Sequence, residues 1–210
     1  MPVDTKQQVV ENRDALREVV GQPMALAATK EMPRLDRHCR AFIALSPFLC
    51  MGTMSADGKA DVSPRGDPPG FVKVLDDRTV LIPDRPGNRR ADSMTNLLAN
   101  PSIGLIFFVP GVEETLRLNG RATIVRDAAL LADMAVNGKA PKLAIRVAID
   151  EVFFHCAKAL KRSRLWDPET RIERAAFPRY AQIIRDQRDT GKTVEEIDAF
   201  IQDNYRNELY

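Results

Sequence analysis

Between residues 48 and 156 the chain is divided into short apolar segments by turn-forming residues, and this pattern restricts the possible folds more than any other feature. The clearest unit is a hairpin with strands over residues 48–54 and 59–63, joined through Asp57-Gly58. Asp-Gly readily adopts the positive φ angles of a tight turn. The central part of the chain is therefore expected to be an antiparallel β structure.

Further segments of strand character recur along the chain, at residues 71–75, 79–82, 103–109, 115–125 and 143–156. Residues 92–100 interrupt this series with a short helix that ends at Asn100-Pro101. A set of about seven short strands, mostly linked by turns, favours a barrel.

Helical periodicity flanks this region on both sides. Helices are predicted over residues 5–20 and 35–45, and two more over 177–210 with a break at Thr190-Gly191. We therefore expect an α+β fold that is mainly β. It would form a single domain over 1–210, with helices in 1–47, the barrel in 48–166 and helices in 167–210.

The charge balance and the cysteine content exclude several classes of function. Lys plus Arg number 31 and Asp plus Glu 29, so net charge gives no basis for nucleic-acid binding. The polar N-terminus and the lack of a long apolar segment argue against secretion and membrane insertion. Three cysteines without a CxxC pair fit a reducing compartment, and a cytoplasmic location is expected.

Motifs for metal binding and hydrolysis are missing. Neighbouring residues on a strand point to opposite faces, so neither His38-Cys39 nor His155-Cys156 is a good chelate, and no metal is expected. The sequence contains no GxSxG, GxxxxGK[ST] or GxGxxG, which leaves hydrolase and nucleotide-triphosphatase functions without support.

The strongest local signal is for a phosphate site. Asn88, Arg89, Arg90 and Ser93 lie between an apolar strand and a helix, where backbone amides and guanidinium groups can converge on one dianion. Arg65, held between Pro64 and Gly66, is placed to reach the same anion. The alternatives are that Arg89 and Arg90 are solvated surface charges, and that Arg65 pairs with Asp67 or Asp84.

These residues belong to runs that resemble the pyridoxamine-phosphate-oxidase-like family of FMN-dependent enzymes. The runs are Asp61 to Asp67, Leu81 to Asp92, Glu113 to Arg121, Cys156-Ala157-Lys158 and Arg162-Ser163-Arg164-Leu165-Trp166. The resemblance implies a flavin-reductase-type split barrel that forms a homodimer, with FMN in a groove between the subunits.

The resemblance also implies roles for particular residues. Arg89 and Arg90 resemble the family's Arg-Lys phosphate pair, and Arg65 its arginine near the ribityl phosphate. Ile82-Pro83 would border the isoalloxazine ring. Thr115 lies where a glutamine often contacts the ring, and Ser63 and Arg117 complete the expected cofactor-binding residues of these runs.

A basic stretch follows the last expected strand and contains Lys158, Arg162 and Ser163. A cation near the N1 and O2 edge of the flavin would stabilise the anionic reduced ring. The alternative is a solvated helix face in which Leu160 and Leu165 pack inward and Trp166 is an anchor.

The sequence departs from the true pyridoxamine phosphate oxidases in two places. Their Arg-x-Val-Leu-Leu-Lys pattern is replaced by residues 65–70, and their C-terminal Arg-x-His motif is absent. We therefore expect an FMN-dependent oxidoreductase that acts on another small molecule and could use NAD(P)H as electron donor. The alternatives are a non-catalytic FMN-binding or redox-sensing protein, and the same barrel with haem or a deazaflavin.

Overall fold

The computed structural model describes residues 9–210, and the chain divides into two compact units at residue 31. Within the described part of the first unit, α1 (Arg13–Val20) and α2 (Ala25–Ala28) bury no residue. The predicted start of the first helix at residue 5 lies outside the described residues, and residues 9–12 are not helical. The helix begins later because the Asn12 side chain accepts a hydrogen bond from the Ala15 amide and caps it.

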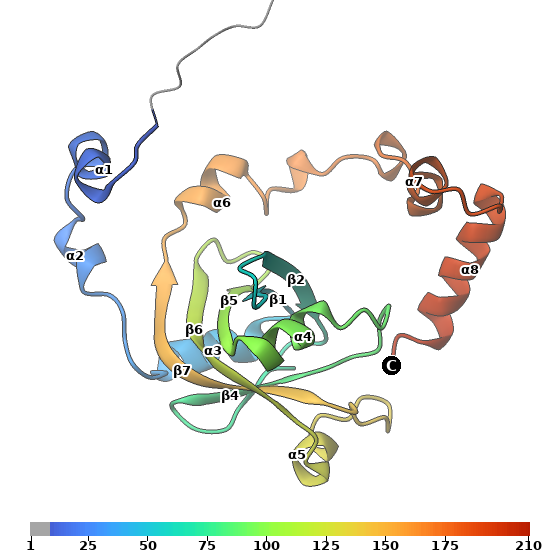
Figure 1. Cartoon of the computed structure of the whole chain (residues 1–210), viewed down its shortest axis with the longest axis horizontal. Helices are drawn as coiled ribbons and strands as arrows, with labels where there is room; N and C mark the ends of the chain where they lie inside the picture. The colour runs from blue at the N-terminus through green and yellow to red at the C-terminus, as the bar shows by residue number, and fades with distance from the viewer. Residues whose placement is uncertain (1–8) are drawn as a thin grey trace, which may run out of the picture. The chain divides into compact units, whose positions relative to one another are not determined.

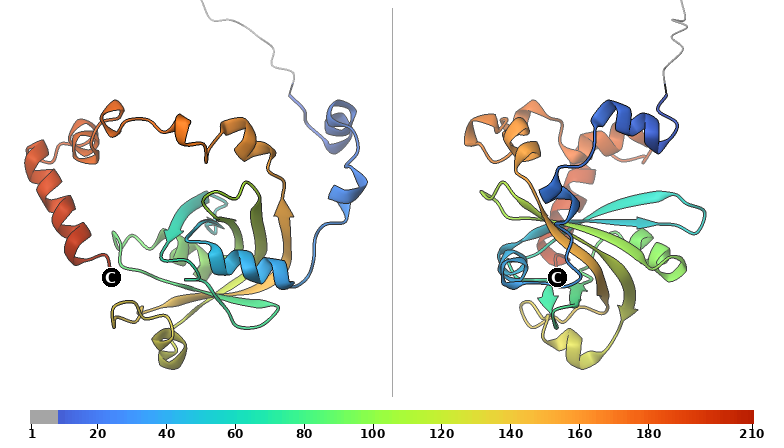
Figure 2. Two further views of the ribbon diagram at one scale, coloured as in Figure 1. Left: turned by 180° about the vertical axis from the view of Figure 1, so that it is seen from behind. Right: turned by 90° about the vertical axis from the view of Figure 1, so that its left-hand side faces the viewer.

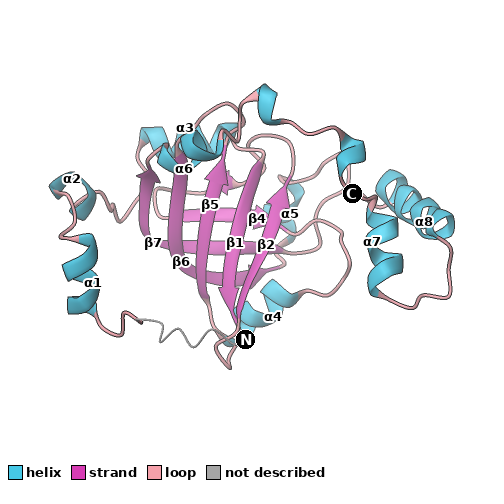
Figure 3. Ribbon diagram, turned by 90° about the horizontal axis from the view of Figure 1, so that it is seen from above, coloured by secondary structure: helices cyan, strands magenta, loops and turns pink. Residues whose placement is uncertain are grey.

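The second unit, residues 32–210, is built on one antiparallel sheet of seven strands in the order β2-β1-β5-β6-β7-β4-β3 (Figures 1 and 3). The strands are β1 (Phe48–Met54), β2 (Ala60–Gly66), β3 (Lys73–Val74), β4 (Thr79–Pro83), β5 (Ser102–Phe108), β6 (Thr115–Val125) and β7 (Ala144–His155). No ladder joins β2 to β3 among residues 9–210, so the sheet is a barrel left open at one seam. This confirms the expected α+β split barrel.

The β1–β2 hairpin forms where it was predicted, with its turn at Asp57-Gly58. Phe48 pairs with Gly66 and Met54 with Ala60, and Gly58 at the turn has φ 83°. The strand expected over residues 71–75 is reduced to the two residues of β3, which pair with Leu81 and Val80.

The core lies on the inner face of the curved sheet. Leu49 and Met51 of β1 are fully buried, as are Phe107 of β5 and Leu116 and Leu118 of β6. Helix α3 (Arg37–Leu45), predicted over residues 35–45, packs on this face with Cys39, Phe42 and Ile43 buried. Its start is set by Asp36, whose carboxylate accepts from the amides of His38 and Cys39.

The remaining helices and 3₁₀ turns lie after β4 in the chain. They are α4 (Asp92–Ala99), α5 (Ala128–Ala132), α6 (Lys158–Ser163), the 3₁₀ turns Pro168–Thr170 and Arg174–Ala176, α7 (Tyr180–Gln187) and α8 (Val194–Asn207). The helix α5 was not expected. In the basic stretch Leu160 is buried and Trp166 anchors on the Val112 carbonyl at 2.8 Å, but Leu165 is 53% exposed, contrary to the alternative that packs it inward.

None of the helices in the described part of the chain is long and apolar enough to cross a membrane. The single domain expected over 1–210 stays a prediction. The two-unit division places the split barrel and the C-terminal helices together in residues 32–210.

Candidate functional site

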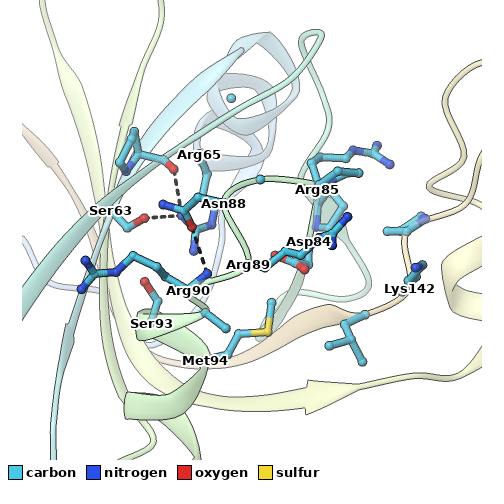
Figure 4. A pocket seen from close by; sticks show the side chains of 18 of the residues that line it. Ser63, Arg65, Asp84, Arg85, Asn88, Arg89, Arg90, Ser93, Met94 and Lys142 are labelled. Carbon is cyan, nitrogen blue, oxygen red and sulfur yellow. Dashed lines mark hydrogen bonds between the residues drawn. The ribbon is translucent and has the colours of Figure 1, made fainter. Parts of the chain in front are cut away.

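A cavity of about 1130 Å³ lies at one end of the barrel, where β2, the loop from β4 to α4, the loop before β7 and the end of α8 meet (Figure 4). Figure 2 shows the ribbons of these elements. The size of the cavity is slightly above the usual range for small-molecule sites. The charged side chains that line it are Asp61, Arg65, Asp84, Arg85, Arg89, Arg90, Asp92, Lys139, Lys142 and Glu208.

Arg65 is half-buried in this cavity and makes no ion pair with any residue in 9–210. Its guanidinium donates to the Ser63 hydroxyl and, at 2.8 Å, to the Pro64 carbonyl. Burial lowers the pKa of Arg65, while the charges of Asp84 and Asp61 raise it. Burial likewise raises the pKa of the Asp84 carboxyl, which Arg65 opposes. A half-buried guanidinium that forms no ion pair can bind an anion that enters the cavity.

The loop before α4 adds a second cation and an open helix N-terminus. Arg89 forms no hydrogen bond or ion pair within residues 9–210, whereas Arg90 pairs with Asp92 at 2.8 Å. Arg89 has φ 61° and Ala91 φ 55°, values that cost residues other than glycine on the order of 1 kcal/mol. Among the described residues no side chain caps α4, so its first amides lack a side-chain acceptor, and Ala91 and Ser93 at this helix end line the cavity.

A polar network fixes α4 against the β1–β2 hairpin. The Ser93 hydroxyl donates to the Asp61 carboxylate at 3.0 Å, and the Thr53 hydroxyl contacts the same oxygen at 3.4 Å. The Asn96 side chain donates to Thr53 at 3.1 Å. The helix N-terminus is therefore held in a set position relative to Arg65 on β2.

A different set of contacts closes the far end of the cavity. Figure 4 shows Ser63, Arg65 and Ser93 on one side and Arg85 and Lys142 on the other. Arg85 Nε donates to Asp67 Oδ2 at 2.5 Å, and its guanidinium also donates to the Met134 carbonyl at 2.8 Å.

Tyr210 completes this end. Its hydroxyl donates to Asp67 Oδ1 at 2.7 Å, its ring lies 5.5 Å from the guanidinium carbon of Arg85, and its main-chain oxygen accepts from Lys139 Nζ at 2.9 Å. The Asp67 side chain is 0% exposed, so both of its oxygens are satisfied inside the protein. The alternative in which Arg65 pairs with Asp67 is wrong because Arg85 takes this carboxylate, and no ion pair joins Arg65 to Asp84 within residues 9–210.

Seven of the residues expected to bind the cofactor lie around the same cavity. The predicted residues that line the cavity are Ser63, Arg65, Pro83, Asn88, Arg89, Arg90 and Ser93. Ile82 is 0% exposed and belongs to the core beside this set.

The other predicted residues lie elsewhere in the subunit. Thr115 is buried at the start of β6 opposite His155, and Arg117 lies 5.0 Å from the Phe153 ring centre. Lys158 and Arg162 are exposed on α6, where the Ser163 hydroxyl donates to the Leu160 carbonyl at 3.1 Å. These residues do not line the cavity of their own chain.

Sequence reasoning missed Lys139, Lys142 and Tyr210 as cavity residues, and it missed the pairing of Asp67 with Arg85 and Tyr210. Tyr210 is 143 positions away from Asp67 in the chain, and no local pattern connects the two. No group of three or more His, Cys, Asp or Glu in residues 9–210 is arranged to hold a metal ion.

Comparison with known protein families shows to which family this chain belongs. The family model described as pyridoxamine 5'-phosphate oxidase matches residues 35–156, which include every strand of the sheet and the cavity residues of β2 and α4. The chain belongs to the pyridoxamine 5'-phosphate oxidase family. No curated protein in the comparison matches this chain.

Solved structures similar to this pyridoxamine 5'-phosphate oxidase family member are distant in sequence. HupZ of Group A Streptococcus is 16% identical, covering 57% of this chain and 93% of its own, with a TM-score of 0.47. An FMN-binding protein from Syntrophomonas wolfei is 12% identical, covering 56% and 83%, with a TM-score of 0.46. General stress protein 26 from Bacillus anthracis is 15% identical, covering 56% and 93%, with a TM-score of 0.42. Family membership therefore rests on the match over residues 35–156.

Proposed function

We propose that the protein binds FMN in the cavity between β2 and α4 and is an FMN-dependent oxidoreductase that acts on a small molecule. The observation that carries the proposal is the pair of cavity cations, Arg65 and Arg89, that have no carboxylate partner within residues 9–210. They lie beside an uncapped helix N-terminus. Membership of a flavin-binding family and the FMN-binding protein among the similar structures give further support.

The residues at this end fit a phosphate monoester. Guanidinium groups and helix amides are the donors that bind phosphate best in proteins. Arg65 and Arg89 would hold the phosphate, the first amides of α4 would complete its shell, and Asn88 and Ser93 would supply polar contacts. When bound, the flavin supplies hydride and electron transfer, and the chain positions it and sets its electrostatic surroundings.

The cofactor is proposed to lie between two copies of this chain. Pro83 lines the cavity, but Thr115, Arg117, Lys158, Arg162 and Ser163 do not. In a homodimer with FMN at the interface, this second group would approach the ring from the partner subunit. NAD(P)H is the proposed electron donor, and the cytoplasm the proposed location.

The experiment is to load the purified protein with FMN, remove unbound cofactor by gel filtration and record the visible spectrum. A retained two-band flavin spectrum is expected, and a haem or deazaflavin spectrum in the protein as purified would replace FMN by that cofactor. Consumption of NADH or NADPH with an electron acceptor then tests the oxidoreductase activity. Retained flavin without any turnover would favour a non-catalytic FMN-binding protein.

Arg89→Ala tests the phosphate site directly. Loss of one charge-assisted contact costs about 1.5 to 3 kcal/mol, so the FMN dissociation constant should rise roughly tenfold to hundredfold in a fluorescence titration. Arg121→Ala is the matched control, because Arg121 is an exposed arginine on β6 that does not line the cavity. An equal affinity in the two variants would contradict the assignment.

A further inference from the structure

The last residues of the chain form part of the cavity wall. Asn207, the last residue of α8, lines the cavity together with Glu208 and Tyr210. Figures 1 and 2 show the end of α8 returning to the loop between β4 and α4. Residues 207–210 are called the closing segment below.

The closing segment is attached at one buried point. Asp67 follows β2 directly and has a side chain that is 0% exposed, with Arg85 on one carboxylate oxygen and the Tyr210 hydroxyl on the other. Burying a carboxylate is costly unless all its hydrogen bonds are made. The Asp67 site is therefore built to take a hydroxyl group at the position that Tyr210 fills.

Two weaker contacts align the segment over the cavity. The Tyr210 ring lies against the Arg85 guanidinium, and Lys139 holds the Tyr210 main-chain oxygen from the loop before β7. Both Arg85 and Lys139 line the cavity. All three contacts therefore hold the segment at the end of the cavity that Arg85 and Lys142 occupy.

We propose that the closing segment is a lid over the Arg85 and Lys142 end of the cavity, latched by Tyr210 on Asp67. For the lid to open, three contacts of Tyr210 must break: its hydroxyl hydrogen bond to Asp67, its ring contact with Arg85 and the hydrogen bond from Lys139. The Arg85–Asp67 pair stays intact. Opening exposes Arg85 to solvent and lets a ligand enter or leave. The lid rests on the cavity being the ligand site, as proposed above, and not on the ligand being FMN.

The first test uses ligand-free protein and the rate at which phenylglyoxal modifies Arg85, measured by peptide mass spectrometry with Arg121 as the internal reference. The Arg85 side chain is 15% exposed under Tyr210, so Tyr210→Ala should raise its rate severalfold and Tyr210→Phe by a smaller factor. Tyr205→Ala and Tyr205→Phe are the matched controls, because Tyr205 lies on α8 just before the closing segment, is 56% exposed and does not line the cavity. An unchanged Arg85 rate in both Tyr210 variants would overturn the lid.

The second test uses FMN-loaded protein and the rate of FMN release on dilution, followed by the recovery of flavin fluorescence. Release should be severalfold faster from Tyr210→Ala than from the wild type and the Tyr205 variants. Faster Arg85 modification with unchanged FMN release would overturn the role of the segment as a lid. If the wild type retains no FMN, the proposed cofactor fails, and the Arg85 measurement decides the lid by itself.

Discussion

At the scale of single residues, the arginines around the cavity differ by the carboxylates near them. Arg85 is committed to buried Asp67, and removal of either partner would cost about 3 to 5 kcal/mol of stability. Arg90 pairs with Asp92 in an exposed contact worth at most about 1 kcal/mol. Arg65 and Arg89 have no such partner within residues 9–210, which leaves their charges for a ligand.

Tyr210 gives a prediction about pH. The hydrogen bond to Asp67, then burial, then the charge of Asp67 raise the pKa of the Tyr210 phenol above its ordinary value of 10.0, and Arg85 lowers it. A group whose pKa is higher in the folded than in the unfolded protein contributes stability below the unfolded pKa. The latch should therefore hold up to about pH 10 and be lost as the pH rises further, through the raised pKa.

The measurement is an ultraviolet titration of phenol ionisation in the wild type and in Tyr210→Phe. The difference between the two curves isolates Tyr210 from Tyr180 and Tyr205, and it should titrate above 10.0. Lys139 and Glu208 also lie at this end of the cavity, and neither forms a hydrogen bond with the phenol. A difference curve centred at or below 10.0 would show that the hydroxyl is not bonded to Asp67.

At the scale of elements, the two longest strands depend on one glycine. The β6–β7 ladder shifts register between Asn119 and Gly120, and a Cβ on Gly120 would lie 2.1 Å from the Ala148 carbonyl oxygen. Such a contact forces the backbone of the neighbouring strand to move. The irregularity bends the sheet toward the barrel and has room for glycine alone.

Gly120→Ala should therefore lower the free energy of unfolding by about 1 to 3 kcal/mol, as overpacking does in other cores. Urea denaturation followed by circular dichroism is the measurement. Gly52→Ala on β1 is the control, since its Cβ would lie 3.7 Å from the Gly104 oxygen, an ordinary contact distance. Equal stability of the two variants would show that β7 can yield at Ala148.

At the scale of the whole molecule, the packed core and the cavity belong to residues 32–210. Helices α1 and α2 bury no residue, and the core clusters contain only residues from the second unit. Stability follows the apolar surface that is buried. The first unit should therefore contribute little to the free energy of unfolding.

A chain that begins at Met32 should unfold within about 1 kcal/mol of the complete chain and bind FMN with the same affinity. Urea denaturation and a flavin titration of both chains are the measurements. A loss of several kcal/mol on removal of the first unit would show that its exposed apolar residues, Val19 and Leu26 among them, are covered in solution.

Much of the fold was predictable because it depends on local patterns. Alternating apolar residues and Asp57-Gly58 determine the β1–β2 hairpin, and Asp36 determines the start of α3. The grouping of Arg65, Asn88, Arg89 and Ser93 around one cavity was predictable for the same reason, since these residues lie within two short runs of sequence. The start of α1 was missed because the Asn12 cap was not recognised, and α5 was missed because a helix of five residues carries little periodic signal.

The sequence by itself determined the mainly β architecture, the strand order of the hairpins and the arginine-rich loop before α4. Only the tertiary structure decided which arginine is paired: Arg85, and not Arg65, reaches Asp67, and Tyr210 arrives from 143 residues away to share that carboxylate. Strand and turn preferences act over a few residues, whereas the partner of a buried charge is chosen by which side chains the packed core brings within hydrogen-bonding distance.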